Sequence, residues 1–570
     1  MGGPVSSGEA GDAAMSARRK ALSGPSGPRG LIQNARVFGI ALFACIGGLL
    51  YGYNQGVFGG VLAMHSFGRH LGDHITNPTK KGWLTAILEL GAWSGTIYTP
   101  IIAEKLSRKY TILVNVMIFC VGVIIQCLSA TRNSNGASFI LGGRFITGMG
   151  VGSLSMTVPM YNAEVAPPEV RGSLVGLQQL AITFGILVSF WIDYGTNYIG
   201  GIGETQSDAA WLVPLALQIF PALVLGVGMI FMPFSPRWLA HHGHEADAVK
   251  VLAKLRGLPE SHELVNIEFL EIKAQSLFEK RSEADAFLQY NRETGGWGTY
   301  IALEAKSLSS LFKSWALGKR VMVATVTMFF QQFTGINAVL YYAPSIFNQL
   351  GLRSSTVSLL ATGVVGMAMF VATIPAVLWI DALGRKPVLV SGAIGMALCH
   401  FAIAVLMAKN ANQWPTHQAS GWAAVSMVWL FVVHFGYSWG PCAWILIAEI
   451  WPMSVRAKGI ALGASSNWMT NFIIGQVTPE MLSTLGWGTY AFFGSVTMTG
   501  AVFIHFFVPE TKQLTLEEMD VIFGAAPAAS GATAAQDRER MDAIRAEVGL
   551  ERALDRLEAG KAGATTTEKV

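Results

Sequence analysis

Three carboxamide side chains lie close together in one apolar stretch of this sequence. Gln331, Gln332 and Asn337 fall within the run QQFTGINAVLYYAP, residues 331–344. A carboxamide offers two N–H donors and a carbonyl acceptor without any charge, so it can match hydroxyl groups, which also both donate and accept. An uncharged set also avoids burying an unpaired ion. The chemistry that these residues could do is therefore reversible, noncovalent recognition of a hydroxyl-rich molecule.

Neighbouring residues could shape such a site. Gly335 would weaken a helix between the carboxamides and allow a break that turns them inward. Trp444 offers an aromatic face to the C–H side of a sugar ring, and Phe435 could form a second wall. The alternatives are structural: a carboxamide can simply bond two membrane helices, at about 0.6 kcal/mol, and Trp444 can fill a helix interface.

A second kind of pattern pairs acids with bases, and it occurs twice. The loop EKLSRK, residues 104–109, is echoed by DALGRK, residues 381–386, at an offset of 381 − 104 = 277. The segment AEVAPPEVRG is echoed by AEIWPMSVRAKG, with an acid seven residues before an arginine in both and an offset of 449 − 164 = 285. The charged candidates are Glu104, Arg108, Glu164, Arg171, Asp381, Arg385, Glu449 and Arg456.

These offsets indicate two structurally similar halves. In a transporter built from repeats, the substrate site lies between the halves near the middle of the membrane. Acids and bases at helix ends could bridge neighbouring helices while one face is closed, and opening that face would break the bridges. The alternative is that these charges are hydrated and only determine topology.

The composition predicts the elements that carry these residues. Hydrophobic residues make up 52% of the 570 residues and charged residues 13%, whereas ordinary soluble domains are about a quarter charged. About twelve apolar stretches are long enough to cross the hydrocarbon core as helices. They lie near Val37–Gly60, Trp83–Ala103, Tyr110–Ala130, Phe139–Met160, Gly172–Tyr194, Trp211–Met232, Val321–Phe347, Val357–Ile380, Pro387–Met407, Gly421–Ile447, Ile460–Leu482 and Tyr490–Val508.

This pattern predicts an all-α membrane protein of two six-helix bundles, residues 37–234 and 319–510. The charged, amphipathic segment 235–318 reads as a helical connector on the cytoplasmic side. Residues 1–36 are rich in Gly, Ser and Pro and are expected to form a disordered cytoplasmic head. In the polar tail, residues 511–570, the run QDRERMDAIRAEVGLERALDRLEAG predicts a short solvated helix.

Charge and cysteine usage narrow the function further. Most Lys and Arg clusters predict that both termini are cytoplasmic, although Arg69, Lys80 and Lys81 break the pattern. The net charge of +4 needs no nucleic-acid partner, since the basic residues lie where membrane insertion places them. All five cysteines fall within predicted spans, which argues against disulfides or a metal cluster. No metal site, cofactor site or catalytic constellation is expected, and the glycines of GRFITGMGVG read as helix-packing residues.

From about Gly47 to Lys512 the sequence resembles the sugar porter family of the major facilitator superfamily. Seven ordered segments carry the resemblance: GRFITGMGVG, AEVAPPEVRG, PFSPRWL, QQFTGINAVLYYAP, GPCAW, SNWMTN and PETKQLTLEEMD. The resemblance implies that Gln331, Gln332 and Asn337 contact sugar. It adds Gln179 and Asn467 to the sugar-binding set, with Trp444 and Phe435 beside them. It also implies that Tyr341 and Tyr342 form an outer gate.

Whether transport is driven by the sugar gradient alone or by protons is left open, because one residue differs from the pattern of the family. Many proton-coupled sugar porters resemble this chain but carry an aspartate where it has Asn54, and asparagine cannot carry a proton. Arg144 matches the family's arginine partner, and the facilitative animal glucose transporters have the same asparagine with arginine. Against uniport stands Glu89, an acid in the middle of the second span, which is by default a functional hypothesis. Uniport is preferred, and proton symport or a structural role of Glu89 are the alternatives.

The sequence therefore predicts a non-enzymatic, multi-pass transporter of a small sugar that works by alternating access, with a monosaccharide such as glucose as substrate. The alternatives are a proton-coupled symporter of a disaccharide, pentose or polyol, and a membrane sugar sensor, for which the tail is short. The partners are sugar, the lipid bilayer and, in a symporter, protons. A monomer is sufficient for transport. The motifs, including the ETKQLTLEEMD ending, resemble those of fungal members of the family, which suggests the plasma membrane.

Overall fold

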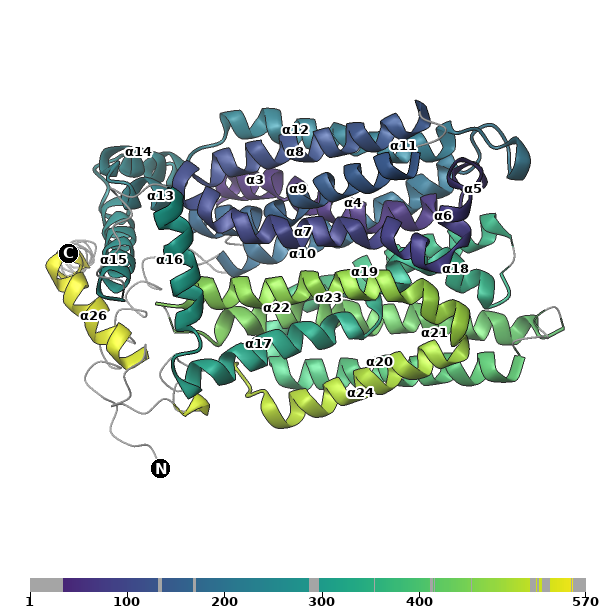
Figure 1. Ribbon diagram of the computed structural model, residues 1–570. Helices are drawn as coiled ribbons and strands as arrows, with labels where there is room; N and C mark the ends of the chain where they lie inside the picture. The colour runs from purple at the N-terminus through teal and green to yellow at the C-terminus, as the bar shows by residue number, and fades with distance from the viewer. Residues whose placement is uncertain are drawn as a thin grey trace, which may run out of the picture.

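The computed structural model describes residues 34–131, 136–167, 171–286, 297–352, 354–410, 414, 416–452, 454–512, 519, 522–524, 534–554 and 556. Within these ranges every regular element is a helix. The long helices run side by side in two groups, one purple to blue and one green to yellow, with a cluster of shorter helices at one end (Figure 1). The disordered head expected for residues 1–36 lies almost wholly outside the described residues.

The first group, the N-terminal half, crosses the membrane six times. Two of its crossings are interrupted helices, Ala35–Val61 and Ala209–Phe231. Short helices α5 (His65–Leu71) and α6 (Asp73–Thr76) follow the first crossing. The long elements are α3 (Ala35–Ala44), α4 (Ile46–Val61), α7 (Pro78–Leu106), α8 (Arg108–Leu128), α9 (Gly136–Val165), α10 (Arg171–Thr196), α11 (Ala209–Leu217) and α12 (Ile219–Phe231).

The second group, the C-terminal half, repeats this arrangement. Its first crossing is broken between α17 and α18, and its fourth between α21 and α22. The elements are α17 (Trp315–Phe333), α18 (Ile336–Gln349), α19 (Ser355–Leu383), α20 (Arg385–Asn410), α21 (Gln418–Tyr437), α22 (Trp439–Glu449), α23 (Arg456–Thr484) and α24 (Trp487–Phe507).

The expected twelve spans in two six-helix bundles are confirmed. In the described part of the chain nine helical segments are both long and apolar enough to cross a membrane. The other three, α7, α9 and α23, have 29, 30 and 29 residues, beyond the roughly 20 that a crossing needs. They are less apolar because they carry buried polar residues such as Glu89, Arg144 and Asn467.

Close helix packing depends on glycine in the N-terminal half. A Cβ at Gly148 of α9 would lie 2.0 Å from the carbonyl oxygen of Leu88, and one at Gly152 would lie 2.0 Å from that of Ala92. Because any side chain there would clash with backbone, glycine at these two positions lets α7 and α9 approach each other closely. The expectation that the GRFITGMGVG glycines are packing residues is confirmed for these two.

The two halves repeat each other down to single backbone positions. Ser107, between α7 and α8, has φ +85°, and Gly384, between α19 and α20, has φ +90°. Their offset, 384 − 107 = 277, is that of the charged loops. A side chain is strained at such a φ, and Ser107 is held there by hydrogen bonds: its carbonyl accepts from the Thr111 hydroxyl at 2.8 Å and its Oγ from the Tyr110 N–H at 3.4 Å.

In the described parts of the connector, four helices gather at one end of the bundles, here called the connector face (Figure 1). They are α13 (Pro236–His241), α14 (Glu245–Arg256), α15 (Glu263–Ala286) and α16 (Trp297–Ser310). The tail helix α26 (Ala534–Glu547) packs on α15. The expectation of a solvated tail helix is wrong, because Met541 and Ile544 are buried against Phe278 of α15.

Candidate functional site

The carboxamides lie around a helix break in the C-terminal half. α17 ends at Phe333, Gly335 takes φ +87°, and α18 begins at Ile336. The expected weakening of the helix at Gly335 is thus confirmed. The Asn337 Nδ2 group donates to Gln332 Oε1 at 2.5 Å, across the break. Asn337 Oδ1 in turn accepts from Gln55 Nε2 of α4 at 3.4 Å, so this pair already joins the two halves.

Gln331 joins three helices of the C-terminal half. Its Nε2 donates to the carbonyl oxygen of Trp439 at 2.8 Å, and its Oε1 accepts from Asn467 Nδ2 at 2.5 Å. Gln331 and Asn467 are 3% and 1% exposed, so their hydrogen bonds are shielded from water in this conformation. The structure therefore brings together four of the predicted sugar-binding residues, Gln331, Gln332, Asn337 and Asn467.

The N-terminal half approaches this cluster at Gly440 of α22. The Gln179 Nε2 atom of α10 lies 3.7 Å from the position of a Cβ on Gly440, and the Phe435 ring lies 3.4 Å from it. Gln331 Nε2 lies 3.4 Å from the Gly440 carbonyl oxygen. Gln179, Phe435 and Gln331 thus converge on one point between the halves. Trp444 lies further along α22 and is partly buried against a hydrophobic core to which both halves contribute.

Two further carboxamides belong to this region and were missed by sequence reasoning. Gln55 bonds Asn337, as described above. Gln178 is 6% exposed and packs on Gly48 of α4, yet neither its nitrogen nor its oxygen has a hydrogen-bond partner among the described residues. Each is the direct neighbour of a residue that was singled out, Asn54 and Gln179. The sequence signal that could have found them is a pair of adjacent polar residues inside an apolar span.

Glu89 joins the two halves nearer the end opposite the connector. Its Oε1 accepts from the Tyr341 hydroxyl of α18 at 2.7 Å, and its Oε2 accepts from Asn471 Nδ2 of α23 at 3.0 Å. The Tyr341 hydroxyl also lies 3.1 Å from Asn471 Oδ1. Glu89 is fully buried. An ionised carboxylate only accepts hydrogen bonds, so two donors from the other half suit it.

Further bonds between the halves lie beyond Glu89 towards the same end. Lys81 Nζ donates to Ser345 Oγ at 3.0 Å and lies 5.9 Å from the centre of the Tyr342 ring. Within the C-terminal half, the Tyr342 hydroxyl donates to the Gly475 carbonyl of α23 at 2.6 Å. Tyr341 and Tyr342 are each 1% exposed. The two tyrosines therefore lie in a closed contact between the halves at this end.

Asn54 and Arg144 use different hydrogen-bond partners. Asn54 Nδ2 donates to the Leu50 carbonyl of its own helix at 3.1 Å. Arg144 Nη2 donates to the Thr85 carbonyl at 3.0 Å, and its guanidinium lies 3.7 Å from the centre of the Phe58 ring. Asn54 Oδ1 and the Arg144 Nε and Nη1 atoms have no hydrogen-bond partner within the described ranges.

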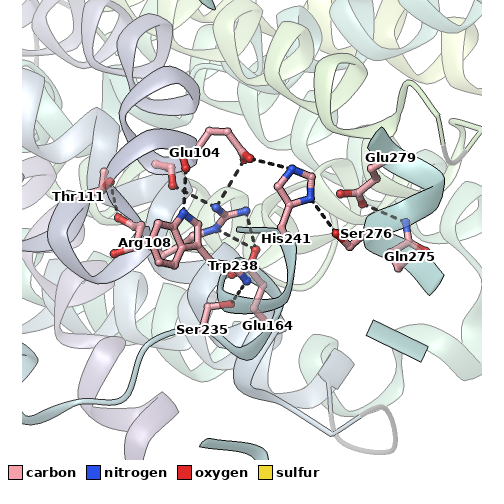
Figure 2. A network of polar contacts seen from close by, with 12 residues as sticks. Glu104, Arg108, Thr111, Glu164, Ser235, Trp238, His241, Gln275, Ser276 and Glu279 are labelled. Atoms are coloured by element: carbon pink, nitrogen blue, oxygen red, sulfur yellow. Dashed lines mark hydrogen bonds and ion pairs between the residues drawn. The ribbon is translucent and has the colours of Figure 1, made fainter. Parts of the chain in front are cut away.

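The charged loop of the N-terminal half forms a network at the connector face (Figure 2). Arg108 bonds Glu164 at 2.9 Å and lies 3.6 Å from Glu104. His241 of α13 links Glu104, 3.4 Å away, to the Ser276 hydroxyl of α15 at 3.1 Å. Trp238 donates its indole N–H to the Glu104 carbonyl at 2.8 Å. The network thus attaches the connector to the N-terminal half.

Burial sets the protonation of His241 in this network. Loss of solvent lowers the pKa of His241 from 6.5 to about 4, although the charge of Glu104 opposes the shift. His241 is therefore neutral near pH 7 and accepts or donates hydrogen bonds as an uncharged ring. Glu279 on α15 is exposed and accepts a hydrogen bond from Gln275 Nε2 at 3.0 Å.

The C-terminal half has a matching pair. Arg385 Nη2 bonds Glu449 Oε1 at 2.7 Å, and Thr511 donates its hydroxyl to Glu449 Oε2 at 2.5 Å. Arg456 donates to the Trp451 carbonyl at 3.4 Å. The side chains of Arg171 and Asp381 lie outside the described part of the structure.

Comparison with known proteins agrees with this architecture. The profile of the family described as "Sugar (and other) transporter" matches residues 40–523, most of the chain. The chain belongs to this sugar porter family of the major facilitator superfamily. Its members are transporters and not enzymes, so the expectations for the family, the fold and the absence of an enzymatic role are confirmed.

Among curated relatives of this sugar porter, the quinate permease of Neurospora africana is 33% identical over 505 residues, covering 86% of this chain and 89% of the relative. A probable quinate permease of Aspergillus fumigatus is 32% identical over 507 residues, covering 87% and 89%. A substrate restricted to glucose is therefore not supported.

A solved structure of the xylose transporter XylE from E. coli, in a partially occluded inward open conformation, matches with a TM-score of 0.68 and 26% identity, covering 85% of this chain and 100% of that one. Another, described as a proton:xylose symporter, matches with a TM-score of 0.66 and 27% identity, covering 86% and 99%.

Proposed function

We propose that this sugar porter carries a monosaccharide across the plasma membrane by alternating access, with the connector face and both termini in the cytosol. One observation supports this most: the buried carboxamides Gln331, Gln332, Asn337 and Asn467 surround a helix break in the C-terminal half, and Gln55 of the N-terminal half bonds Asn337. Such a set can exchange its mutual hydrogen bonds for those of a sugar without leaving a charge unpaired.

The transport cycle follows from where the two halves touch. With the connector face inside, Tyr341, Tyr342 and Glu89 close the outer side. Sugar then leaves inward as the charged networks around Arg108 and Arg385 rearrange. The two ends need not be open together, because each end has its own set of bonds between packed elements.

For the driving force we propose uniport. Asn54 cannot carry a proton, and both oxygens of Glu89 accept hydrogen bonds from Tyr341 and Asn471, an arrangement that an ionised carboxylate satisfies without a proton. Proton symport through Glu89 is the alternative, and the likeness to a proton:xylose symporter is the finding in its favour.

Uptake of labelled glucose and xylose in a yeast strain without its own sugar carriers tests the proposal. We expect saturable uptake that equilibrates with the medium and is unchanged by a protonophore. Accumulation above the external concentration that collapses with the protonophore would instead establish symport. Growth rescue without measurable exchange of either sugar would argue against monosaccharide transport.

A cyclic polyol acid such as quinate is a second candidate substrate. The curated relatives named above are quinate permeases, and Arg144 has two guanidinium nitrogens without a hydrogen-bond partner among the described residues. A carboxylate could pair with such a buried cation. Labelled quinate uptake that glucose and xylose do not inhibit would support this candidate over the monosaccharide.

A further inference from the structure

A histidine from another helix bonds the chain at the helix break beside the carboxamides. His400, on α20, is 2% exposed, and its Nε2 atom lies 2.8 Å from the carbonyl oxygen of Thr334. A carbonyl oxygen can only accept a hydrogen bond, so Nε2 carries the hydrogen and donates it. Thr334 lies between the end of α17 and Gly335. His400 therefore holds the chain at the point where the helix is interrupted.

This bond replaces one that the break removes. In a continuous α-helix, the Thr334 carbonyl would accept from the backbone N–H group four residues on, at Ala338. Instead, Gly335 has φ +87°, and the backbone ladder of α18 starts with the Val339 N–H donating to the Gly335 carbonyl at 3.1 Å. Thr334 is 1% exposed, and a buried carbonyl without a partner costs about as much as a lost hydrogen bond. The His400 N–H group therefore stabilises the broken form of the helix.

Aromatic rings hold His400 in this orientation. The centre of its imidazole ring lies 4.4 Å from that of Phe431 on α21 and 5.9 Å from that of Phe493 on α24. Phe493 also packs against the break, because a Cβ on Gly335 would lie 3.0 Å from its ring. The other ring nitrogen of His400, Nδ1, has no hydrogen-bond partner among the described residues. Within that part of the chain, the bond to Thr334 is thus the polar contact for which the ring is placed.

The bond to Thr334 is connected to the carboxamide cluster. The Thr334 hydroxyl donates to the Gln331 carbonyl at 2.7 Å, and the bond from Asn337 to Gln332 spans the break at 2.5 Å. In a straight helix, side chains five positions apart point about 140° away from each other. Gln332 and Asn337 can therefore meet only while the helix is broken, which is the form that His400 stabilises.

We propose that His400 is a positioning residue of the sugar site, which rests on the function proposed above: its bond to the Thr334 carbonyl keeps the chain in the broken form in which Gln332 and Asn337 meet. His400 acts through the backbone and not by touching sugar. When only a fraction of the molecules has the form that binds, the apparent affinity falls by that fraction. Loss of the His400 N–H group should therefore raise the KM for sugar and leave the maximal rate per transporter nearly unchanged.

Two substitutions of His400 separate its N–H group from its ring. Both remove the ring, but His400→Gln keeps an N–H donor at a similar reach, whereas His400→Leu has none. We expect the KM to rise about fivefold or more in His400→Leu, the effect of losing one buried hydrogen bond, and to change by less than about twofold in His400→Gln. Met407→Ala, two turns further along α20, removes another buried side chain and should lower thermal stability without changing the KM. An equal KM in His400→Leu and His400→Gln would overturn the proposal.

A distance measurement without sugar tests the same bond independently of the substrate. Spin labels on Met322→Cys and Asn348→Cys, at exposed positions of α17 and α18, report the break in full-length transporter whose five native cysteines are replaced by alanine. In a straight α-helix the two positions lie about 39 Å apart, at 1.5 Å per residue, and any bend shortens this distance.

We expect one distance with His400 in place and in His400→Gln, and an additional, longer distance in His400→Leu. The same distribution in all three proteins would overturn the role of His400. The expected distances in a protein that takes up no sugar would instead count against the proposed function and leave the bond of His400 to the break established.

Discussion

At the scale of single residues, the sugar site proposed above consists of carboxamides that bond one another. Gln331 is central because it joins Trp439 of α22 and Asn467 of α23. A sugar that enters must replace some of these bonds, so the affinity for sugar depends on how well its hydroxyls reproduce them.

Gln331→Ala should weaken sugar binding more than it lowers protein abundance. Loss of one such partner costs about 1–3 kcal/mol, which corresponds to an increase in KM of about 5-fold to 150-fold. Initial uptake rates across a range of sugar concentrations measure it. Gln275→Ala, on the connector, is the matched control, and an equal KM in the two variants would remove Gln331 from the site.

Glu89 allows a sharper residue-scale test. In Glu89→Gln, the new amide N–H group meets the Asn471 N–H group, unless one amide turns over, and the bond between the halves weakens. We expect uptake to fall about fivefold or more, as for a loss of about 1 kcal/mol. Adding Asn471→Asp reverses the direction of the bond and should restore much of the uptake, measured as a double-mutant cycle. If the two losses simply add, Glu89 and Asn471 do not act through their bond.

At the scale of elements, the break between α17 and α18 positions the site. Gly335 has φ +87°, and a Cβ there would lie 3.0 Å from the Phe493 ring. The break therefore depends on glycine both for its backbone conformation and for its space.

Gly335→Ala should destabilise the protein by about 1–2 kcal/mol and lower uptake at the same time. Gly318→Ala in α17 is the control, because nothing lies within 4 Å of its Cβ position and alanine favours the helix by up to about 1 kcal/mol. Thermal unfolding in detergent compares the two. A Gly335→Ala protein with unchanged stability and uptake would show that the break tolerates a side chain.

At the scale of the whole molecule, the connector is held to the N-terminal half by a group that titrates. Burial lowers the pKa of His241 to about 4, from 6.5. The unfolded or undocked state therefore binds a proton more readily than the docked state. Docking is fully stable above about pH 6.5 and weakens as the pH falls towards 4.

Limited proteolysis of the connector as a function of pH measures this effect. We expect cleavage to rise as the pH falls from 6.5 towards 4, with a loss of docking free energy of at most about 1.4 kcal/mol per pH unit. In His241→Gln, which keeps a polar side chain but cannot titrate, this part of the pH dependence should disappear. An unchanged profile would assign the pH dependence to another group and contradict this role of His241.

The sequence by itself determined the membrane helices, the two-fold repeat and the identity of the polar candidates. The reason is that the hydrocarbon core of a membrane requires each spanning helix to be apolar and about 20 residues long. A carboxamide or an acid within such an apolar stretch is therefore easily recognised in the sequence. Gly335, the glycines of α9 and the charged loops could be recognised because their chemistry is local.

Only the tertiary structure decided which of these residues meet. Gln55 faces Asn337, Glu89 faces Tyr341 and Asn471, and the tail helix docks on α15, because those contacts join segments hundreds of residues apart and depend on how the halves pack. The tail shows the reason clearly. Its stripe of Met541, Ile544 and Val548 has the same periodicity whether it faces water or a partner, and only the position of Phe278 on α15 shows that it has one. The carboxamides Gln331 and Asn337 likewise have partners outside their own helices only because the fold places α4, α22 and α23 around them.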